Sequence, residues 1–210
     1  EIPNECGVLD RLTQPQEEEL EDSFSKNAGS VSVSRNASTA FKIHYTPERD
    51  DFRHLTTFIL DSNAALAAAK SCGVSLTVYL TSAMLLALQR IQDEQTPDKR
   101  RQKPIRVVVP VNLRRLFPSR TLRNFVHVIM PEIDPRMGDY EFSEILTSVK
   151  HQLGLLVTKK NLCAMFTPNV NAERSPLLRV MPLFLKNIAM KLVYDTVGER
   201  TNCLNLSNLG

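Results

Sequence analysis

Two polar side chains follow a long apolar run in the middle of the sequence. The run extends from Pro104 to Val111, is rich in β-branched residues, and leads into Asn112 and Arg114. Such a run is typical of a strand buried on both faces of a sheet, so its polar end should lie at the surface or in a cleft. A carboxamide and a guanidinium placed there need partners, because burying them unpaired is costly. Two interpretations are open: a strand end held by a structural salt bridge, and a polar cluster at the mouth of an active-site cleft.

Cysteines are spread along the chain and form no Cys-x-x-Cys pair, which disfavours a zinc site and a thioredoxin-like motif. They are Cys6, Cys72, Cys163 and Cys203. We expect buried free thiols, because unpaired cysteine packs as a small apolar residue; a nucleophilic cysteine is the minor alternative. Reduced thiols fit a cytosolic protein, and the polar first residues do not form a signal peptide, so we expect a cytoplasmic location.

The order of several short motifs resembles a known family. Val109-Pro-Val-Asn-Leu-Arg114, followed by Thr121-Leu-Arg-Asn-Phe125, resembles the alcohol acetyltransferase-like branch of the chloramphenicol acetyltransferase and condensation-domain superfamily. Gly73-Val-Ser-Leu-Thr77 opens an apolar helix before that strand, as in the family. Leu206-Ser-Asn-Leu-Gly210 resembles a later strand motif. The resemblance covers roughly residues 36 to 210.

The catalytic motif of that superfamily is absent from this sequence. Its members use a His-His-x-x-x-Asp-Gly motif, whose second histidine is the general base, in the half that precedes the segment seen here. The histidines of this chain stand alone, at His44, His54, His127 and His151. The resemblance therefore implies an α/β fold with a mixed β-sheet and packed helices, the second half of a two-subdomain fold. It implies no catalytic residue in this chain, and we expect the fragment alone to be inactive.

The resemblance implies transfer of an acyl group from a coenzyme A or carrier thioester to an alcohol or amine. Such a reaction needs a general base and donors for the oxyanion. Arg114 is expected to pair with the acid of the missing motif. The other expected substrate-binding residues are Asn112, Asn124, Ser207 and Asn208. Neither a metal nor a tightly bound cofactor is expected. The expected partners are the missing first half and small-molecule acyl donor and acceptor. The alternative is a non-catalytic binding or scaffold module of the same fold.

Charge divides the chain into two parts. Residues 1–38 contain the acidic run Glu17–Asp22 and are expected to form a solvated linker between the two halves, before residues 39–210. The formal net charge of +3 is too small to argue for a nucleic-acid partner.

Apolar periodicity predicts the remaining elements. We expect strands at residues 40–45, 55–60 and 125–130. Helices are expected after Asp61 or Ser62, from Ser75 or Thr77 to about Gln95, and over residues 140–159, with Asp139 able to cap the start and His151 off the apolar stripe. Pro182 is expected to kink or restart the helix that begins at Pro176. The apolar segment 183–193 after it is expected to be a core helix, rather than one that lies on a membrane or lines an apolar substrate channel.

Overall fold

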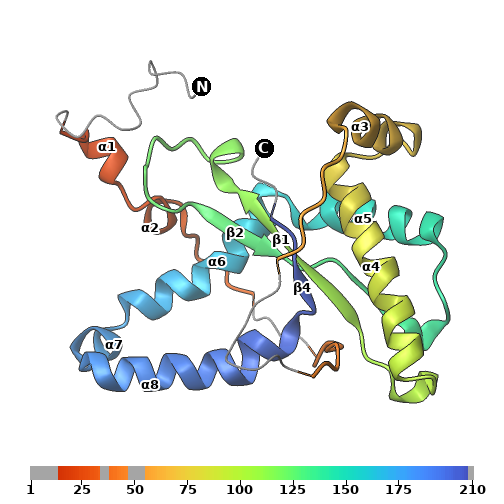
Figure 1. The fold of residues 1–210 in the computed structure, drawn as a ribbon. Helices are drawn as coiled ribbons and strands as arrows, with labels where there is room; N and C mark the ends of the chain where they lie inside the picture. Colours follow the sequence, from red (N-terminus) through yellow and green to blue (C-terminus); the bar gives the residue numbers. More distant parts are fainter. Residues whose placement is uncertain (1–13, 34–37, 47–54, 208–210) are drawn as a thin grey trace.

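One long strand organises the molecule. The computed structural model describes residues 14–33, 38–46 and 55–207. Strand β1 (Ile105–Asn112) pairs antiparallel with β2 (Val126–Ile129) and β3 (Glu132–Ile133) along one edge, and parallel with β4 (Leu204–Asn205) along the other (Figure 1). The protein is therefore α/β, with a small mixed sheet, as the sequence predicts.

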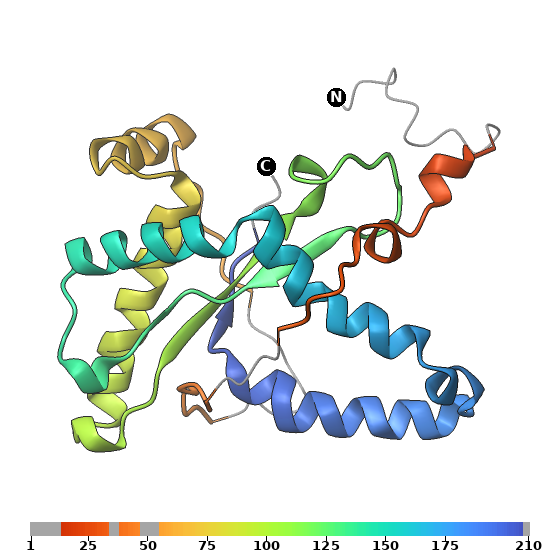
Figure 2. The same cartoon turned by 180° about the vertical axis from the view of Figure 1, so that it is seen from behind.

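Helices cover one face of this sheet and leave the other open. The end of α5 and helix α6 cross behind the strands and come to the front in the reverse view, where the rest of α5 lies across α4 (Figure 2). The helices are α1 (Glu17–Leu20), α2 (Ser23–Asn27), α3 (Ser62–Ser71), α4 (Leu76–Gln95), α5 (Phe142–Leu156), α6 (Lys159–Arg174), α7 (Pro176–Val180) and α8 (Leu183–Val193).

The core lies between the sheet and the covering helices. Side chains alternate along a strand, so Ile105, Val107 and Val109 point to the same face and are all buried. A cluster of aromatic rings closes one end of this core. The Phe24 ring lies edge-on to the rings of Phe125 and Phe166, with centroid distances of 4.9 and 5.4 Å.

The helix boundaries follow local capping chemistry. The Ser75 hydroxyl accepts a hydrogen bond from the Val78 N–H, and α4 ends at Gln95, as predicted. Asp139 does not cap α5, because its carboxylate pairs with Lys99. The helix begins instead at a reciprocal capping box, in which the Glu141 N–H donates to the Glu144 carboxylate at 2.7 Å.

Two predicted strands are absent. In residues 40–45, Phe41 is buried and Lys42 exposed, as an alternating strand requires. The segment makes isolated contacts instead of a ladder: the Ala40 N–H donates to Arg200 O, and the Phe41 N–H to Pro104 O. Residues 55–60 have no regular secondary structure and are exposed, with Ile59 96 % exposed, and no described strand pairs with them.

The prediction for segment 183–193 is half wrong. The helix forms and restarts after Pro182, as expected, but it is not a core helix. None of the side chains of α8 is buried against the described residues; Phe184 is 64 % exposed and Ile188 56 % exposed. No single helix in the described part of the chain is long and apolar enough to cross a membrane. Among the described helices, the pair α3 and α4, bent by 83° between them, is the one that meets the length and composition of a span.

The acidic N-terminal segment is only partly solvated. Glu17 and Glu18 are exposed, as predicted for a linker. Beyond them, α2 packs against the core through Phe24. The Ser23 hydroxyl lies 2.6 Å from the Ser119 hydroxyl, and the Thr121 hydroxyl donates to Glu21 O at 2.7 Å. Residues 21–29 therefore belong to the packed structure.

Candidate functional site

A cleft of about 820 Å³ opens at the end of β1; we call it the strand-end cleft. Most of its wall is apolar, which suits a ligand with a hydrocarbon part. The lining residues that carry polar side chains are Thr77, Asn112, Arg115, Asn124 and Ser207. These come from the start of α4, the end of β1 and its following turn, the start of β2, and the segment after β4.

Pro110 explains why the strands separate at this point. In a pair of parallel strands, only alternate residues of one strand form hydrogen bonds with the neighbouring strand. Val108 O accepts from the Leu206 N–H at 2.8 Å, so the next residue of β1 in line for this neighbour is Pro110. Proline has no N–H, and the β1–β4 ladder cannot continue. Ser207, just beyond the last bond, then lines the cleft.

Three of the predicted site residues meet in this cleft. Asn112, Asn124 and Ser207 are all exposed and all line it, although they lie in three separate segments of the sequence. Asn208 lies outside the described residues. Arg114 is not among the lining residues of the cleft.

Arg114 instead holds the loop that follows β1. The Asn112 Oδ1 atom accepts from the Arg114 N–H at 3.1 Å and starts the 3₁₀ turn Leu113–Arg115. The guanidinium Nε and Nη2 atoms donate to Thr121 O at 3.2 and 2.8 Å. Nη2 also donates to Arg123 O at 2.6 Å. The partners are thus backbone carbonyls, and within the described residues Arg114 forms no salt bridge. Within the described residues these carbonyls hold the strand end, and the pairing of Arg114 with an acid of the missing half stays a prediction.

Arg115, which the sequence analysis did not select, is the cation of the cleft. The 3₁₀ turn has about three residues per turn, so three successive side chains point in three directions. Leu113 enters the core, Arg114 turns to the loop carbonyls, and Arg115 is exposed at the cleft. The sequence signal was present in the Leu-Arg-Arg triplet, but choosing between the arginines requires the turn geometry.

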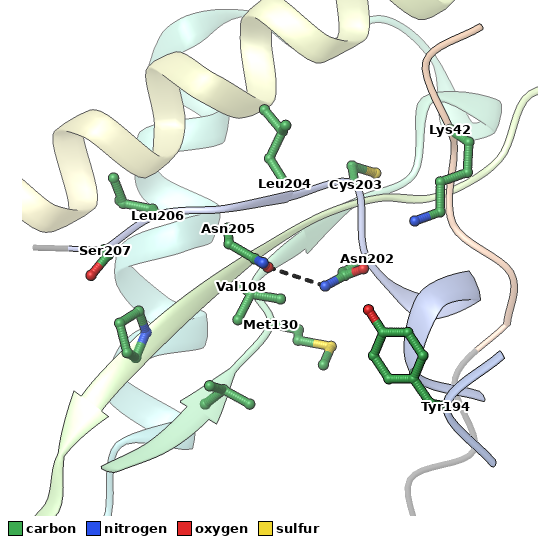
Figure 3. A pocket seen from close by; sticks show the side chains of 13 residues that line it. Lys42, Val108, Met130, Tyr194, Asn202, Cys203, Leu204, Asn205, Leu206 and Ser207 are labelled. Carbon is green, nitrogen blue, oxygen red and sulfur yellow. Dashed lines mark hydrogen bonds between the residues drawn. The ribbon is translucent and has the colours of Figure 1, made fainter. Parts of the chain in front are cut away.

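A second cleft of about 690 Å³ lies on the open face of the sheet, and we call it the sheet-face cleft (Figure 3). Lys42, Tyr194 and the pair Asn202 and Asn205 line it, and the Asn202 amide donates to Asn205 Oδ1 at 3.1 Å. The two clefts adjoin, because they share the lining residues Pro110, Val128, Leu206 and Ser207. A single extended ligand can therefore contact both.

The one described thiol that lines either cleft is poorly suited to nucleophilic attack. Cys203 lines the sheet-face cleft, and burial raises the pKa of its thiol, outweighing the opposing effect of the Arg106 N–H. It therefore stays protonated at neutral pH. Cys163 is half-buried and donates to Asn27 O at 3.1 Å. Cys72 is exposed, so the expectation of buried thiols is wrong for it. Cys6 lies outside the described residues.

Among the described histidines, none lines either cleft. His44 is exposed and bonds to Gln95, and His151 is exposed on α5, as predicted. His127 is buried on β2, with its ring 6.2 Å from that of Phe166. His54 lies outside the described residues. The described residues also contain no cluster of metal-binding side chains.

Comparison of the chain with protein-family models, with curated proteins and with solved structures finds no match. Function is therefore inferred from the two clefts. They offer amide and hydroxyl groups, an arginine and apolar walls, which are suited to binding and orienting a ligand.

Proposed function

We propose that this chain forms a substrate-binding cleft of an acyltransferase related to the chloramphenicol acetyltransferase and condensation-domain superfamily. The reaction moves an acyl group from a coenzyme A or carrier thioester to an alcohol or amine. One observation supports the proposal above all others: Asn112, Asn124 and Ser207, chosen from sequence motifs, line one cleft.

The chemistry of the strand-end cleft suits such substrates. Its apolar wall, which includes Leu116 and Val157, is compatible with an acyl chain. The carboxamides of Asn112 and Asn124 can donate to a carbonyl oxygen and accept from a hydroxyl or amine. The Arg115 guanidinium suits a phosphate group of coenzyme A or of a carrier arm.

The general base of this proposed reaction is a histidine outside these 210 residues, in the other half of a two-subdomain fold. The sheet-face and strand-end clefts then lie at the junction of the two halves. The exposed segment 55–60, which no described strand pairs with, is consistent with a surface that the other half covers.

Calorimetric titration of the 210-residue chain with acetyl-coenzyme A tests this proposal. We expect binding, and we expect Asn112→Ala and Asn124→Ala each to weaken it about tenfold, the loss of one or two hydrogen bonds. Asn171→Ala, at an exposed position on α6, is the matched control and should bind as the parent chain does. If acetyl-coenzyme A does not bind, or if Asn171→Ala weakens its binding as much as the cleft substitutions do, the strand-end cleft is not the substrate site.

Turnover provides a separate test of where the chemistry lies. In a thiol-release assay, the chain alone should show only background activity with a panel of alcohols and amines. Turnover that disappears in His127→Ala or His151→Ala would place the base in this chain and contradict the proposal.

A second candidate is a non-catalytic binding or scaffold module of the same fold. It is favoured by the finding that no described histidine lines either cleft. The two candidates differ in the full-length protein: an acyltransferase releases thiol from an acyl thioester, whereas a scaffold module binds without release.

A further inference from the structure

Helix α8 presents an apolar surface that the described structure leaves uncovered. Leu183, Phe184, Ile188 and Met190 are each more than half exposed, and none of the helix residues is buried against the described chain. Soluble monomers rarely expose a contiguous apolar patch of this kind without a function for it. The helix therefore needs a partner.

One side of α8 is wholly apolar, and lysines border it. At 100° per residue, Phe184, Leu185 and Ile188 fall on this side, together with Ala189 and Leu192. Lys191 borders it next to Phe184 and Lys186 lies beyond Ala189, while the remaining arc holds Leu183, Asn187 and Met190. Long lysine side chains in this position can extend their ammonium groups away from an apolar layer. This is the arrangement of a helix that lies in the plane of an interface.

Charge selects the kind of partner. Residues 174–194 contain four basic side chains, Arg174, Arg179, Lys186 and Lys191, and no acidic one. Pairing with the same helix of a second copy would bring like charges together, which disfavours self-association. An anionic lipid surface satisfies both features, because it accepts apolar side chains and attracts lysines.

The position of the helix permits contact with a flat surface. In both views α8 runs along one outer edge of the molecule (Figures 1 and 2). With 11 residues it is about 16 Å long, much shorter than the roughly 30 Å apolar thickness of a bilayer. It can therefore lie on a membrane but cannot cross one.

We propose that α8 docks this chain onto an anionic lipid surface, with Phe184 and Ile188 entering the apolar layer and Lys186 and Lys191 contacting the headgroups. This inference uses neither cleft, so its failure would leave the acyltransferase proposal standing. A lipid surface would nevertheless bring an apolar acyl donor or acceptor close to the protein.

The chain contains no tryptophan, so a single introduced tryptophan reports on its own surroundings. Phe184→Trp should give a blue-shifted emission when vesicles of phosphatidylcholine and phosphatidylserine are added, and a weaker response with phosphatidylcholine alone. Leu155→Trp is the matched control, because Leu155 is a comparably exposed apolar residue on α5. The control should not shift. An unchanged Phe184→Trp spectrum, or an equal shift in the control, would overturn the proposal.

Co-sedimentation with the same anionic vesicles measures the two contributions separately. Ile188→Ser should lower the apparent affinity about tenfold, through lost apolar burial. Lys186→Gln and Lys191→Gln should each lower it about fivefold, and raised salt should weaken parent binding. Leu155→Ser and Lys70→Gln, exposed changes on other helices, should leave it unchanged.

These α8 variants should keep the parent melting temperature, because no α8 side chain is buried. Gel filtration adds one more decisive result. If Phe184→Trp is already blue-shifted without vesicles and the chain elutes as a dimer that Ile188→Ser dissociates, a second copy covers α8 and the lipid proposal is wrong.

Discussion

Strand β1 and helix α8 are both apolar runs, yet their surroundings are opposite. In β1, Ile105 and Val107 are fully buried, whereas α8 has no buried residue. β1 has hydrogen-bonded neighbours on both edges and helices against one face. The comparison teaches that apolar composition marks a segment that needs a partner, while topology decides whether the same chain supplies it.

The difference has an energetic meaning. Burying one large apolar side chain contributes about 1.5–3 kcal/mol. In β1 this free energy stabilises the folded chain. In α8 the apolar side chains are not buried within the described structure, so the free energy of burying them can drive binding to another surface. Substitutions in the two regions should therefore change different measurements.

The largest expected effect comes from a matched pair of phenylalanine substitutions. Phe125 is fully buried beside Phe24 and Phe117, so Phe125→Ala should lower the free energy of unfolding by about 3–5 kcal/mol. Phe184→Ala, on exposed α8, should change it by less than about 0.5 kcal/mol. Urea unfolding of both variants measures the contrast. A large loss in Phe184→Ala would show that α8 is covered in the free protein.

The next effect concerns two arginines near β1. Arg106 is buried; its guanidinium pairs with Glu132 and donates to Ser38 Oγ at 3.0 Å and Thr201 O at 3.4 Å. It joins three segments, so Arg106→Ala should lower the free energy of unfolding by about 3 kcal/mol.

Arg115→Ala is the control for this change, because Arg115 is exposed and its side chain has no hydrogen bond within the described structure. Its stability should stay within about 0.5 kcal/mol of the parent chain. A similar small effect in Arg106→Ala, again by urea unfolding, would mean that water or another side chain replaces its contacts.

Local sequence signals predicted much of the fold. The β-branched run at β1, the Ser75 cap of α4 and the Pro182 restart of α8 all have short-range physical causes, and all are confirmed. Segment 55–60 has the same composition as a strand, but a strand needs a neighbour to pair with. That neighbour is a property of the tertiary structure, so composition alone gave the wrong answer there.

The candidate site was predictable in part for the same reason. Asn112 is the last residue of β1, and Asn124 shortly precedes β2. Residues at the ends of neighbouring strands lie at the same edge of a sheet. Arg106 was missed because, within an apolar run, a single charged residue gives no sign of its buried partners. The prediction chose Arg114, whereas Arg115 lines the strand-end cleft. Which of the two arginines faces the cleft depends on a 3₁₀ turn that the sequence does not specify.

A smaller contrast lies within the acidic segment, between exposed Glu18 and the capping residue Asp22. The Asp22 carboxylate accepts from the Phe24 N–H at 3.1 Å and the Ser25 N–H at 3.3 Å, which fixes the start of α2 and places Phe24 on the core. Asp22→Ala should therefore lower the free energy of unfolding by about 1 kcal/mol at neutral pH. Glu18→Ala should leave it nearly unchanged.

This last effect should depend on pH with a definite sign. Hydrogen bonds from the Ser25 side chain and from the backbone of Ser25 and Phe24 lower the pKa of Asp22, against the opposing effect of burial. A lowered folded pKa stabilises the protein above the unfolded value of about 3.9, and the contribution is lost as the pH falls through the folded pKa. Urea unfolding from about pH 7 to about pH 3 should show the parent and Asp22→Ala curves converging at the acidic end. Asp22→Asn retains a capping oxygen without a charge, so its advantage over Asp22→Ala should not vary with pH. A parent-to-alanine difference that stays constant down to the lowest pH would show that the cap acts without its charge.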